Sequence, residues 1–247
     1  MRALSRTDTG RRRRMNQDYV FLSDTPVGAL PNLLILADGM GGHNAGDYAS
    51  RYTVETIVDS VRNSKEHAPI PIIKKAIQCA NQAVLAKAQT DIDLEGMGTT
   101  VVVATVLGDE LCVANVGDSR LYLAGDCLEQ ITKDHSYVQE MVRRGELSPE
   151  AARVHPDRNI ITRAIGGGKG IAIDFFEVEL MAGDRILMCS DGLTDMLEDW
   201  EIFEIINKGQ DLSSILRELV DVANQYGGND NITVIMAEAF GSEVAKC

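Results

Sequence analysis

The fold is decided by the stretch Leu33-Leu34-Ile35-Leu36-Ala37-Asp38-Gly39-Met40-Gly41-Gly42, an apolar run that ends on an aspartate and continues into glycines. Five apolar residues bounded by turn-forming residues predict a buried strand. The glycines allow the backbone to approach another group closely or to adopt a positive φ. The predicted strand therefore carries the carboxylate of Asp38 to the rim of a sheet. Taken alone, the pattern fits a cation site and an ordinary glycine turn equally well.

Three more aspartates stand where predicted strands begin or end. Asp18 precedes Tyr19-Val20-Phe21-Leu22, Asp191 follows Met188-Cys189-Ser190, and Asp230 lies just before Ile232-Thr233-Val234. If these strands share one core, their carboxylates meet, and mutual repulsion raises their pKa values unless cations neutralise them. Oxygen ligands without histidine or thiolate favour Mg²⁺ or Mn²⁺ over zinc. Two such ions about 3.5–4 Å apart can activate a water and hold a phosphoryl oxygen, which indicates phosphoester hydrolysis.

Composition limits the class of protein and its partners. The 247 residues are 45% hydrophobic and 25% charged, with no linker or repeat, which predicts one globular domain over residues 1–247. The net charge of −13 argues against nucleic acid, because duplex binding needs a basic face. Five scattered cysteines without a CxxC pair are typical of a reducing cytoplasm. No segment has the apolar core of a signal peptide or the roughly 20 apolar residues of a membrane span, so we expect no membrane partner.

The order of the predicted elements indicates the fold class. Helical spacing predicts helices at 49–61, about 72–84 and about 212–225. Strand patterns occur at 19–22, 100–106, 111–116, 120–123, 171–180, 185–189 and 232–238. Because strands and helices come in blocks, we expect an α+β fold with antiparallel sheets and helices outside them. Residues 134–165 are irregular and polar, with helical character at 136–144 and 149–153, and are either a mobile flap or a plain surface insertion.

Other phosphate and metal motifs fail on inspection. The segment from Asp91 opens like an EF-hand loop, but Val102 stands where the bidentate glutamate belongs. The glycines at 166–170 lack the spacing of a Walker A loop or a dinucleotide fingerprint. No cysteine is followed six residues later by arginine, and no GxSxG elbow occurs. A covalent nucleophile is therefore not indicated.

Six short motifs follow one another in a recognisable order. They are Arg13-x-x-Asn16-Gln17-Asp18, Asp38-Gly39-Met40-Gly41-Gly42, Met97-Gly98-Thr99-Thr100, Val116-Gly117-Asp118-Ser119-Arg120, Ser190-Asp191-Gly192-Leu193-Thr194-Asp195 and Asp230-Asn231-Ile232-Thr233. Together they resemble the metal-dependent protein serine/threonine phosphatases of type 2C, in the compact bacterial branch. The resemblance implies two antiparallel β-sheets packed as a sandwich, helices on both outer faces, and a dinuclear metal site at one end.

The resemblance also implies roles for individual residues. Asp38 would bridge two Mn²⁺ or Mg²⁺ ions with the carbonyl of Gly39 on the second, and Asp191 and Asp230 would hold the first. Asp18 would act through bound water, and Gln17 stands where many relatives carry glutamate.

Further positions match the family pattern with alternatives left open. Asp118 and Asp195 fall where bacterial relatives bind a third, looser ion, although Asp118 also fits a simple turn aspartate. Arg13 matches the arginine that grips the phosphate, which suits a guanidinium fork. His43 would protonate the leaving seryl or threonyl oxygen, or is an exposed loop histidine. His155 and Asn159 are weaker candidates for substrate contact.

The function implied is hydrolysis of phosphoserine and phosphothreonine in proteins by a water activated between two divalent metal ions. The implied partners are a eukaryotic-type serine/threonine kinase and its targets, and a monomer is expected. Two rival hypotheses remain: a catalytically silent module that binds phosphoproteins, and a hydrolase of small phosphate esters.

Overall fold

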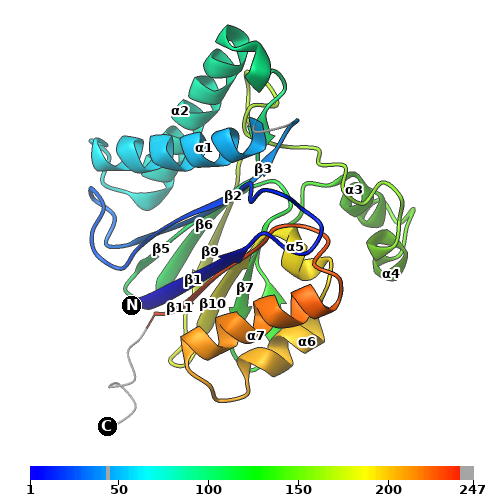
Figure 1. The fold of residues 1–247 in the computed structure, drawn as a ribbon. Helices are drawn as coiled ribbons and strands as arrows, with labels where there is room; N and C mark the ends of the chain where they lie inside the picture. The colour runs from blue at the N-terminus through cyan, green and yellow to red at the C-terminus, as the bar shows by residue number, and fades with distance from the viewer. Residues whose placement is uncertain (43–44, 240–247) are drawn as a thin grey trace.

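Two antiparallel sheets stack face to face in the computed structural model, which describes residues 1–42 and 45–239 (Figure 1). The first sheet has the strand order β1 (Arg2–Asp8), β11 (Ile232–Glu238), β10 (Arg185–Cys189), β7 (Arg120–Ala124) and β8 (Leu128–Gln130). The second has the order β2 (Asp18–Ser23), β3 (Leu33–Met40), β5 (Val101–Leu107), β6 (Glu110–Val116) and β9 (Asp174–Glu179), with β4 (Gly98–Thr99) paired to β3. Every strand pair is antiparallel among the described residues.

Helices cover both outer faces of the sandwich, as expected from the sequence. The second sheet carries α1 (Ala45–Arg62) and α2 (Pro69–Thr90), and the first carries α6 (Asp199–Ile206) and α7 (Leu212–Gln225) (Figure 1). Shorter elements are η1 (Ile92–Leu94), α3 (Tyr137–Arg143), α4 (Pro149–Arg153) and α5 (Asp191–Thr194). The predicted α+β sandwich is confirmed. Among the described helices, none combines the length and the apolar character needed to cross a bilayer.

Strand β3 shows why the deciding stretch is apolar throughout. Leu34 and Leu36 lie in the layer between the two sheets, whereas Leu33 and Ile35 lie in the layer beneath α1 and α2. A strand that is buried on both faces needs a continuous apolar run, because alternate side chains point to opposite faces. A third apolar layer fills the space between the first sheet and α6 and α7. The sandwich therefore rests on three stacked apolar layers.

The structure adds elements that the pattern did not predict. Strand β1 occupies the edge of the first sheet, where its register pairs Arg2 with Glu238 and Asp8 with Ile232. Only Ala3 is buried in this strand, so no apolar alternation marks it. Helix α6 begins with a capping box in which Glu198 and Glu201 exchange backbone and side-chain hydrogen bonds. Helix α1 begins at Ala45, before the predicted residue 49.

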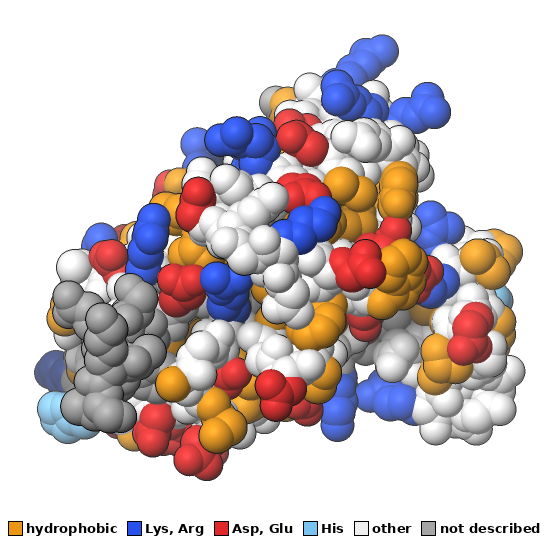
Figure 2. All heavy atoms as spheres, turned by 90° about the horizontal axis from the view of Figure 1, so that it is seen from below, with side chains coloured by type: hydrophobic (Ala, Val, Ile, Leu, Met, Phe, Trp, Pro, Cys, Tyr) orange, Lys and Arg blue, Asp and Glu red, His pale blue; other side chains and the backbone are white. Residues whose placement is uncertain are grey.

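The flap comprises residues 134–165 and carries α3 and α4, close to the helical segments expected there. Ser136 and Ser148 cap these helices by accepting hydrogen bonds from the backbone N–H groups of Gln139 and Ala151. Backbone bridges between Ser136 and Ile161 and between residues 99 and 165 close its base. Figure 2 shows a hollow between this flap and the body of the molecule.

Candidate metal centre

Four aspartates from both sheets meet at one end of the sandwich. Asp18 begins β2 and lies directly opposite Asp38 of β3. Asp191 begins α5 after β10 ends, and Asp230 stands two residues before β11. The negative charges of Asp18, Asp191 and Asp230 all act on the carboxyl group of Asp38, together with that of Asp118. The convergence predicted from the strand ends is therefore present in the fold.

The backbone of Asp38 is fixed by the neighbouring Gly98-Thr99-Thr100 segment. Its N–H donates to Thr100 Oγ1 at 3.0 Å, and its carbonyl accepts from Thr100 N at 2.9 Å and from Thr99 Oγ1 at 2.8 Å. Thr100 Oγ1 also lies 2.8 Å from Ser119 Oγ, next to Asp118. The two threonines thus hold Asp38 in place and connect it to the Asp118 turn.

Gly39 tolerates no side chain at its position. Its N–H donates to the carbonyl of Gln17 at 3.0 Å, and a Cβ added to it would lie 2.0 Å from the carbonyl oxygen of Gly46. Such a contact would force the start of α1 away from β3. The glycine therefore allows the first turn of α1 to approach the backbone beside Asp38.

Ser190 and Asn231 join the loops that carry the other aspartates. Ser190 Oγ donates to Asp18 Oδ2 at 2.8 Å and accepts from Thr233 N at 3.0 Å. Asn231 Oδ1 accepts from Gln17 N at 2.8 Å, and Asn231 Nδ2 donates to the carbonyls of residues 9 and 15. Both side chains connect one sheet to the other, and both residues are buried. They hold Asp18 close to Asp191 and Asp230.

Burial and mutual repulsion raise the pKa values of the clustered carboxyl groups. Burial is the larger cause for Asp38 and Asp191, and the neighbouring aspartates raise the pKa of each further, well above the usual range. Burial raises the pKa of Asp18 to about 6, although hydrogen bonds from Thr233 and Ser190 lower it in part. Such a group of acids is costly to ionise without a cation beside it.

Buried carboxylate oxygens without a hydrogen-bond partner show that these side chains fit a hard metal ion. Among the described residues, Asp18 Oδ1, Asp118 Oδ1 and Asp191 Oδ1 are buried and have no hydrogen-bond partner. Buried carboxylate oxygens are ordinarily satisfied, because an unpaired one loses its hydration without compensation. Carboxylate and carbonyl oxygens are the ligands that Mg²⁺ and Mn²⁺ prefer. The cluster therefore fits divalent cations of this class.

A second group of acids adjoins the first. Burial is the larger cause that raises the pKa of Asp118, and together with the charges of Asp134 and Asp195 it brings this pKa to about 7. Asp118 and Asp195 both raise the pKa of Asp191, so the three carboxyl groups are neighbours. Asp195 is also 3.5 Å from the guanidinium of Arg158 in the flap. Asp118 is thus part of an acidic cluster, which favours the metal-site hypothesis over a simple aspartate in a turn.

Arg13 reaches the centre from the loop before β2. Its Nη2 donates to Asp230 Oδ2 at 2.6 Å, and its side chain is 52% exposed. This hydrogen bond raises the pKa of the guanidinium, so Arg13 is a permanent positive charge beside the acids. Its placement suits an anion approaching from solvent.

The remaining predicted site residues fall in different places. His43 lies outside the described residues. Asn159 lines the cavity between the flap and the body, whereas His155 is absent from its lining and accepts from Asp157 N at 3.1 Å. Gln17 takes part through its backbone, which bonds to Asn231 and Gly39.

Sequence reasoning missed a polar network at the base of the flap. His135 is buried, and its Nδ1 accepts from the backbone N–H of Gly117 at 3.0 Å. Its Nε2 lies 3.1 Å from Asp174, which also pairs with Arg163 at 2.8 Å. No motif marks His135, whereas Ser190 and Asn231 lie inside quoted motifs and could have been assigned from them.

Comparison with known proteins agrees with this geometry. Residues 8–237 match the family described as Protein phosphatase 2C. The chain belongs to this family. It is 40% identical over 247 residues to the serine/threonine phosphatase stp of Listeria monocytogenes, covering 96% of both chains. It is 39% identical over 239 residues to the protein phosphatase PhpP of Streptococcus pneumoniae, covering 93% of this chain and 94% of the relative.

Solved structures of bacterial serine/threonine phosphatases share the fold. The crystal structure of serine/threonine phosphatase Stp1 from Staphylococcus aureus matches with a TM-score of 0.90 and 36% identity, over 97% of this chain and 95% of that one. The catalytic domain of PstP in complex with two manganese ions matches with a TM-score of 0.83 and 35% identity, over 95% and 96%. The resemblance drawn from the six motifs is thereby confirmed, and the chain is a metal-dependent protein serine/threonine phosphatase.

Proposed function

We propose that this phosphatase, as one catalytic domain, removes phosphate from phosphoserine and phosphothreonine at the aspartate centre with two divalent cations. The observation that carries the proposal is the convergence of buried carboxyl groups from both sheets around Asp38. The unbonded oxygens of Asp18 and Asp191 support it. The two manganese ions named for the PstP domain support Mn²⁺, and Mg²⁺ is the alternative ion because it prefers the same ligands.

Each ligand comes from a defined place in the fold. We assign Asp38 and the carbonyl of Gly39 to the ions from the second sheet, and Asp191 and Asp230 from the first. Asp18 Oδ1, buried and unbonded, is assigned to accept a hydrogen bond from a water. A third ion is assigned to the cluster of Asp118, Asp191 and Asp195.

The proposed chemistry follows from these groups. Bound divalent cations neutralise phosphoryl oxygens and lower the pKa of water. Arg13 binds two phosphoryl oxygens through its guanidinium fork and orients the ester. His43 donates a proton to the leaving seryl or threonyl oxygen. Burial raises the pKa of the Cys189 thiol to about 12, so this cysteine near the site is a poor nucleophile, and we propose direct attack by water.

The test is release of phosphate from a phosphothreonine peptide with Mn²⁺, against EDTA and Asp191→Ala. We expect turnover that disappears in both controls. No turnover with metal binding shown separately would favour a silent phosphoprotein-binding module. Turnover of small phosphate esters alone would favour a metabolic hydrolase. A phosphoenzyme trapped by rapid quench would overturn direct attack by water.

The family resemblance also suggests the biological setting. We propose that the substrates include a eukaryotic-type serine/threonine kinase and its targets. The names of the bacterial relatives, a serine/threonine phosphatase and a protein phosphatase, support phosphoproteins as the substrates. We further propose that the protein is a monomer. We also propose that it works in a reducing cytoplasm, which the four free cysteines among the described residues support. Dephosphorylation of an autophosphorylated kinase of this type by the purified chain would test the partner.

A further inference from the structure

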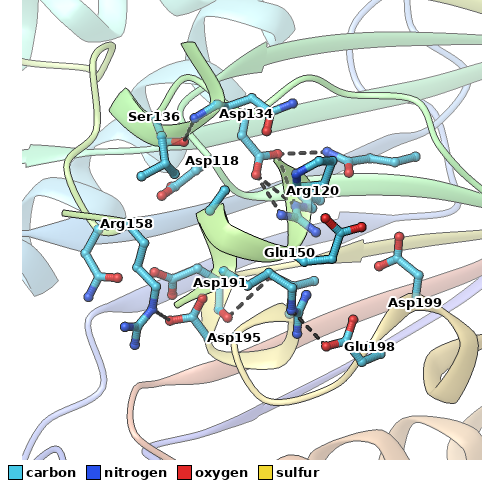
Figure 3. A pocket seen from close by; sticks show the side chains of 18 of the residues that line it. Asp118, Arg120, Asp134, Ser136, Glu150, Arg158, Asp191, Asp195, Glu198 and Asp199 are labelled. Carbon is cyan, nitrogen blue, oxygen red and sulfur yellow. Dashed lines mark hydrogen bonds and ion pairs between the residues drawn. The ribbon is translucent and has the colours of Figure 1, made fainter. Parts of the chain in front are cut away.

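A cavity of about 580 Å³ lies between the flap and the body, directly beside the metal centre (Figure 3). Asp118 and Asp191 form its inner wall and are shared with the proposed metal ligands. Farther out, Glu150 of α4 lines it from the flap, and Asp199 and Trp200 of α6 line it from the body. A substrate whose phosphate sits at the metal centre therefore has neighbouring residues within reach of this cavity, because each residue of extended chain spans about 3.3–3.6 Å.

The arginines that line the cavity are all neutralised by its acids. Arg120 pairs with Asp134 at 2.8 Å. Arg153 pairs with Glu198 at 2.9 Å, and Arg158 with Asp195 at 3.5 Å. These three pairs leave no net positive charge on the walls. Among the described residues that line the cavity, an anionic side chain of a substrate would therefore find no unpaired arginine or lysine.

Two acids in the outer part of the cavity, Glu150 and Asp199, form no ion pair among the described residues, and the hydrogen bonds that lower the pKa of Glu150 come from neutral groups, its own backbone N–H and Ser148. Within the described ranges, neither Glu150 nor Asp199 has an arginine, lysine or histidine within ion-pair distance. The hydrogen bond that Asp199 accepts is neutral, from the hydroxyl of Tyr122 at 3.1 Å. In Figure 3 both carboxylates are drawn against the open space of the cavity. The outer part is thus acidic even when cations neutralise Asp118 and Asp191.

An exposed aromatic side chain accompanies these acids. Trp200 lines the cavity and is 61% exposed, which is unusual for a tryptophan. The face of an indole attracts a cation held within about 6 Å of the ring. Uncompensated carboxylates together with an accessible indole suit a lysine or arginine side chain, whose apolar stem can also lie along the ring.

We propose that this cavity binds a lysine or arginine side chain of the phosphoprotein substrate, a few residues from the phosphorylated serine or threonine. The inference rests on the proposed function and specifies its substrate class. Glu150 and Asp199 bind the cationic head, and Trp200 contacts the stem. The phosphatase therefore selects sites with a basic neighbour, independently of the groups that hold the phosphate.

The experiment compares kcat/KM across a panel of phosphothreonine peptides with Mn²⁺. One peptide has neutral flanks, and the others carry a single arginine, or a single glutamate, at each of three positions on either side. We expect arginine at one or two positions to raise kcat/KM about three- to tenfold over the neutral peptide, and glutamate there to lower it. The preference should weaken as salt rises, because the outer acids are exposed.

Matched variants test whether the cavity is responsible. In the double variant Glu150→Gln with Asp199→Asn, the ratio of kcat/KM between arginine and neutral peptides should fall to about one, while turnover of the neutral peptide stays unchanged. Glu146→Gln with Glu204→Gln removes the same charge from exposed positions of the flap and of α6 outside the cavity, and should keep the preference. Trp200→Leu should weaken the preference in part. Thermal unfolding with Mn²⁺ checks that each variant is folded.

Three results would overturn the inference. One is equal kcat/KM for arginine and neutral peptides at every position, and another is a preference for glutamate. The third is an equal loss of the preference in both double variants, which would show that the preference for arginine depends on the net charge of the protein and not on the cavity. Turnover of the neutral peptide keeps these failures distinct from failure of the proposed function, which would appear as no hydrolysis of any peptide.

Discussion

The guanidinium of Arg13 and the carboxylate of Asp230 form a 2.6 Å ion pair across the mouth of the metal centre. Both side chains are partly exposed, so the pair is open to exchange with solvent and ligands. The same carboxylate is our proposed ligand for a cation, and the same guanidinium is our proposed ligand for phosphate. Binding of metal and substrate would therefore break this ion pair. Asp230 would then pair with the cation, and Arg13 with the phosphate.

Replacing Arg13 should weaken phosphate binding. A charge-assisted hydrogen bond contributes about 1.5–3 kcal/mol, so we expect Arg13→Ala to lower kcat/KM about 10- to 150-fold, mainly through KM. Arg13→Lys should recover part of the loss, since lysine keeps the charge without the fork. Steady-state kinetics on a phosphothreonine peptide measures both. Arg12→Ala is the control, and an equal loss there would refute a specific role for Arg13.

Removing the carboxylate of Asp38 should make the melting temperature independent of Mn²⁺. A cation at about 100 times its dissociation constant adds roughly 2.7 kcal/mol when it binds only the folded state. We expect Mn²⁺ to raise the melting temperature of the wild type and EDTA to reverse the rise. Asp38→Asn should lose this response and, in EDTA, be at least as stable as the wild type, because a buried like charge is gone. Asp221→Asn, exposed on α7, should respond to Mn²⁺ like the wild type, and a full response in Asp38→Asn would contradict the assignment.

His135 should make stability fall in acid. Burial lowers the pKa of its imidazole, while Asp174 partly opposes this and Arg163 and Arg143 lower the pKa further. Below an unfolded pKa of about 6.5 the unfolded chain takes up a proton that the folded chain resists, so stability is present above that pH and is lost as pH falls. Protonation at Nδ1 would also break its hydrogen bond with Gly117 N.

Urea unfolding in EDTA at several pH values tests this expectation. His135→Asn keeps an acceptor near Gly117 without a titrating ring. The wild type should lose more free energy of unfolding between about pH 7 and pH 5 than this variant does. Parallel curves for the two proteins would show that His135 contributes nothing to the acid response.

Asn231 should matter for both folding and metal binding. Its side chain makes three hydrogen bonds, to Gln17 N and to the carbonyls of Thr9 and Met15. Asn231→Ala leaves these partly buried backbone groups without their partner, and we expect a loss of about 1–3 kcal/mol in the free energy of unfolding. Metal affinity should fall too, because Asp18 and Asp230 lose their common support. Asn229→Ala, on an exposed neighbour, should change neither value in urea unfolding or Mn²⁺ titration.

Sequence patterns predicted the elements whose burial is strong. Strands β10 and β11 and helix α7 have the predicted bounds, because their apolar residues follow a clear period. Strand β1 was missed because it forms by pairing with β11 at an edge and buries only Ala3. Helix α6 was missed because its capping box begins at Glu198, and glutamate is not among the residues that usually mark the start of a helix.

The sequence predicted the four aspartates of the candidate site, but not the cavity beside them. Asp38 was found because a carboxylate at the end of a buried strand is conspicuous, and the other three aspartates followed by the same rule. The cavity of Glu150 and Asp199 was not predictable, since its walls come from distant segments whose helices have no shared pattern. Likewise, His135 gains its partners only through folding of the flap base.

The apolar layer between the two sheets sets the distance between the metal ligands. Asp18 and Asp38 belong to one sheet, whereas Asp191 begins α5 after β10 of the other sheet and Asp230 lies just before its strand β11. The side chains packed between the sheets therefore act as a spacer. Small changes of volume there, such as Leu36→Val or Val102→Ile, would move one pair of carboxylates relative to the other without touching either. Ion selectivity and turnover can therefore be tuned from the hydrophobic interior, well away from the reacting groups.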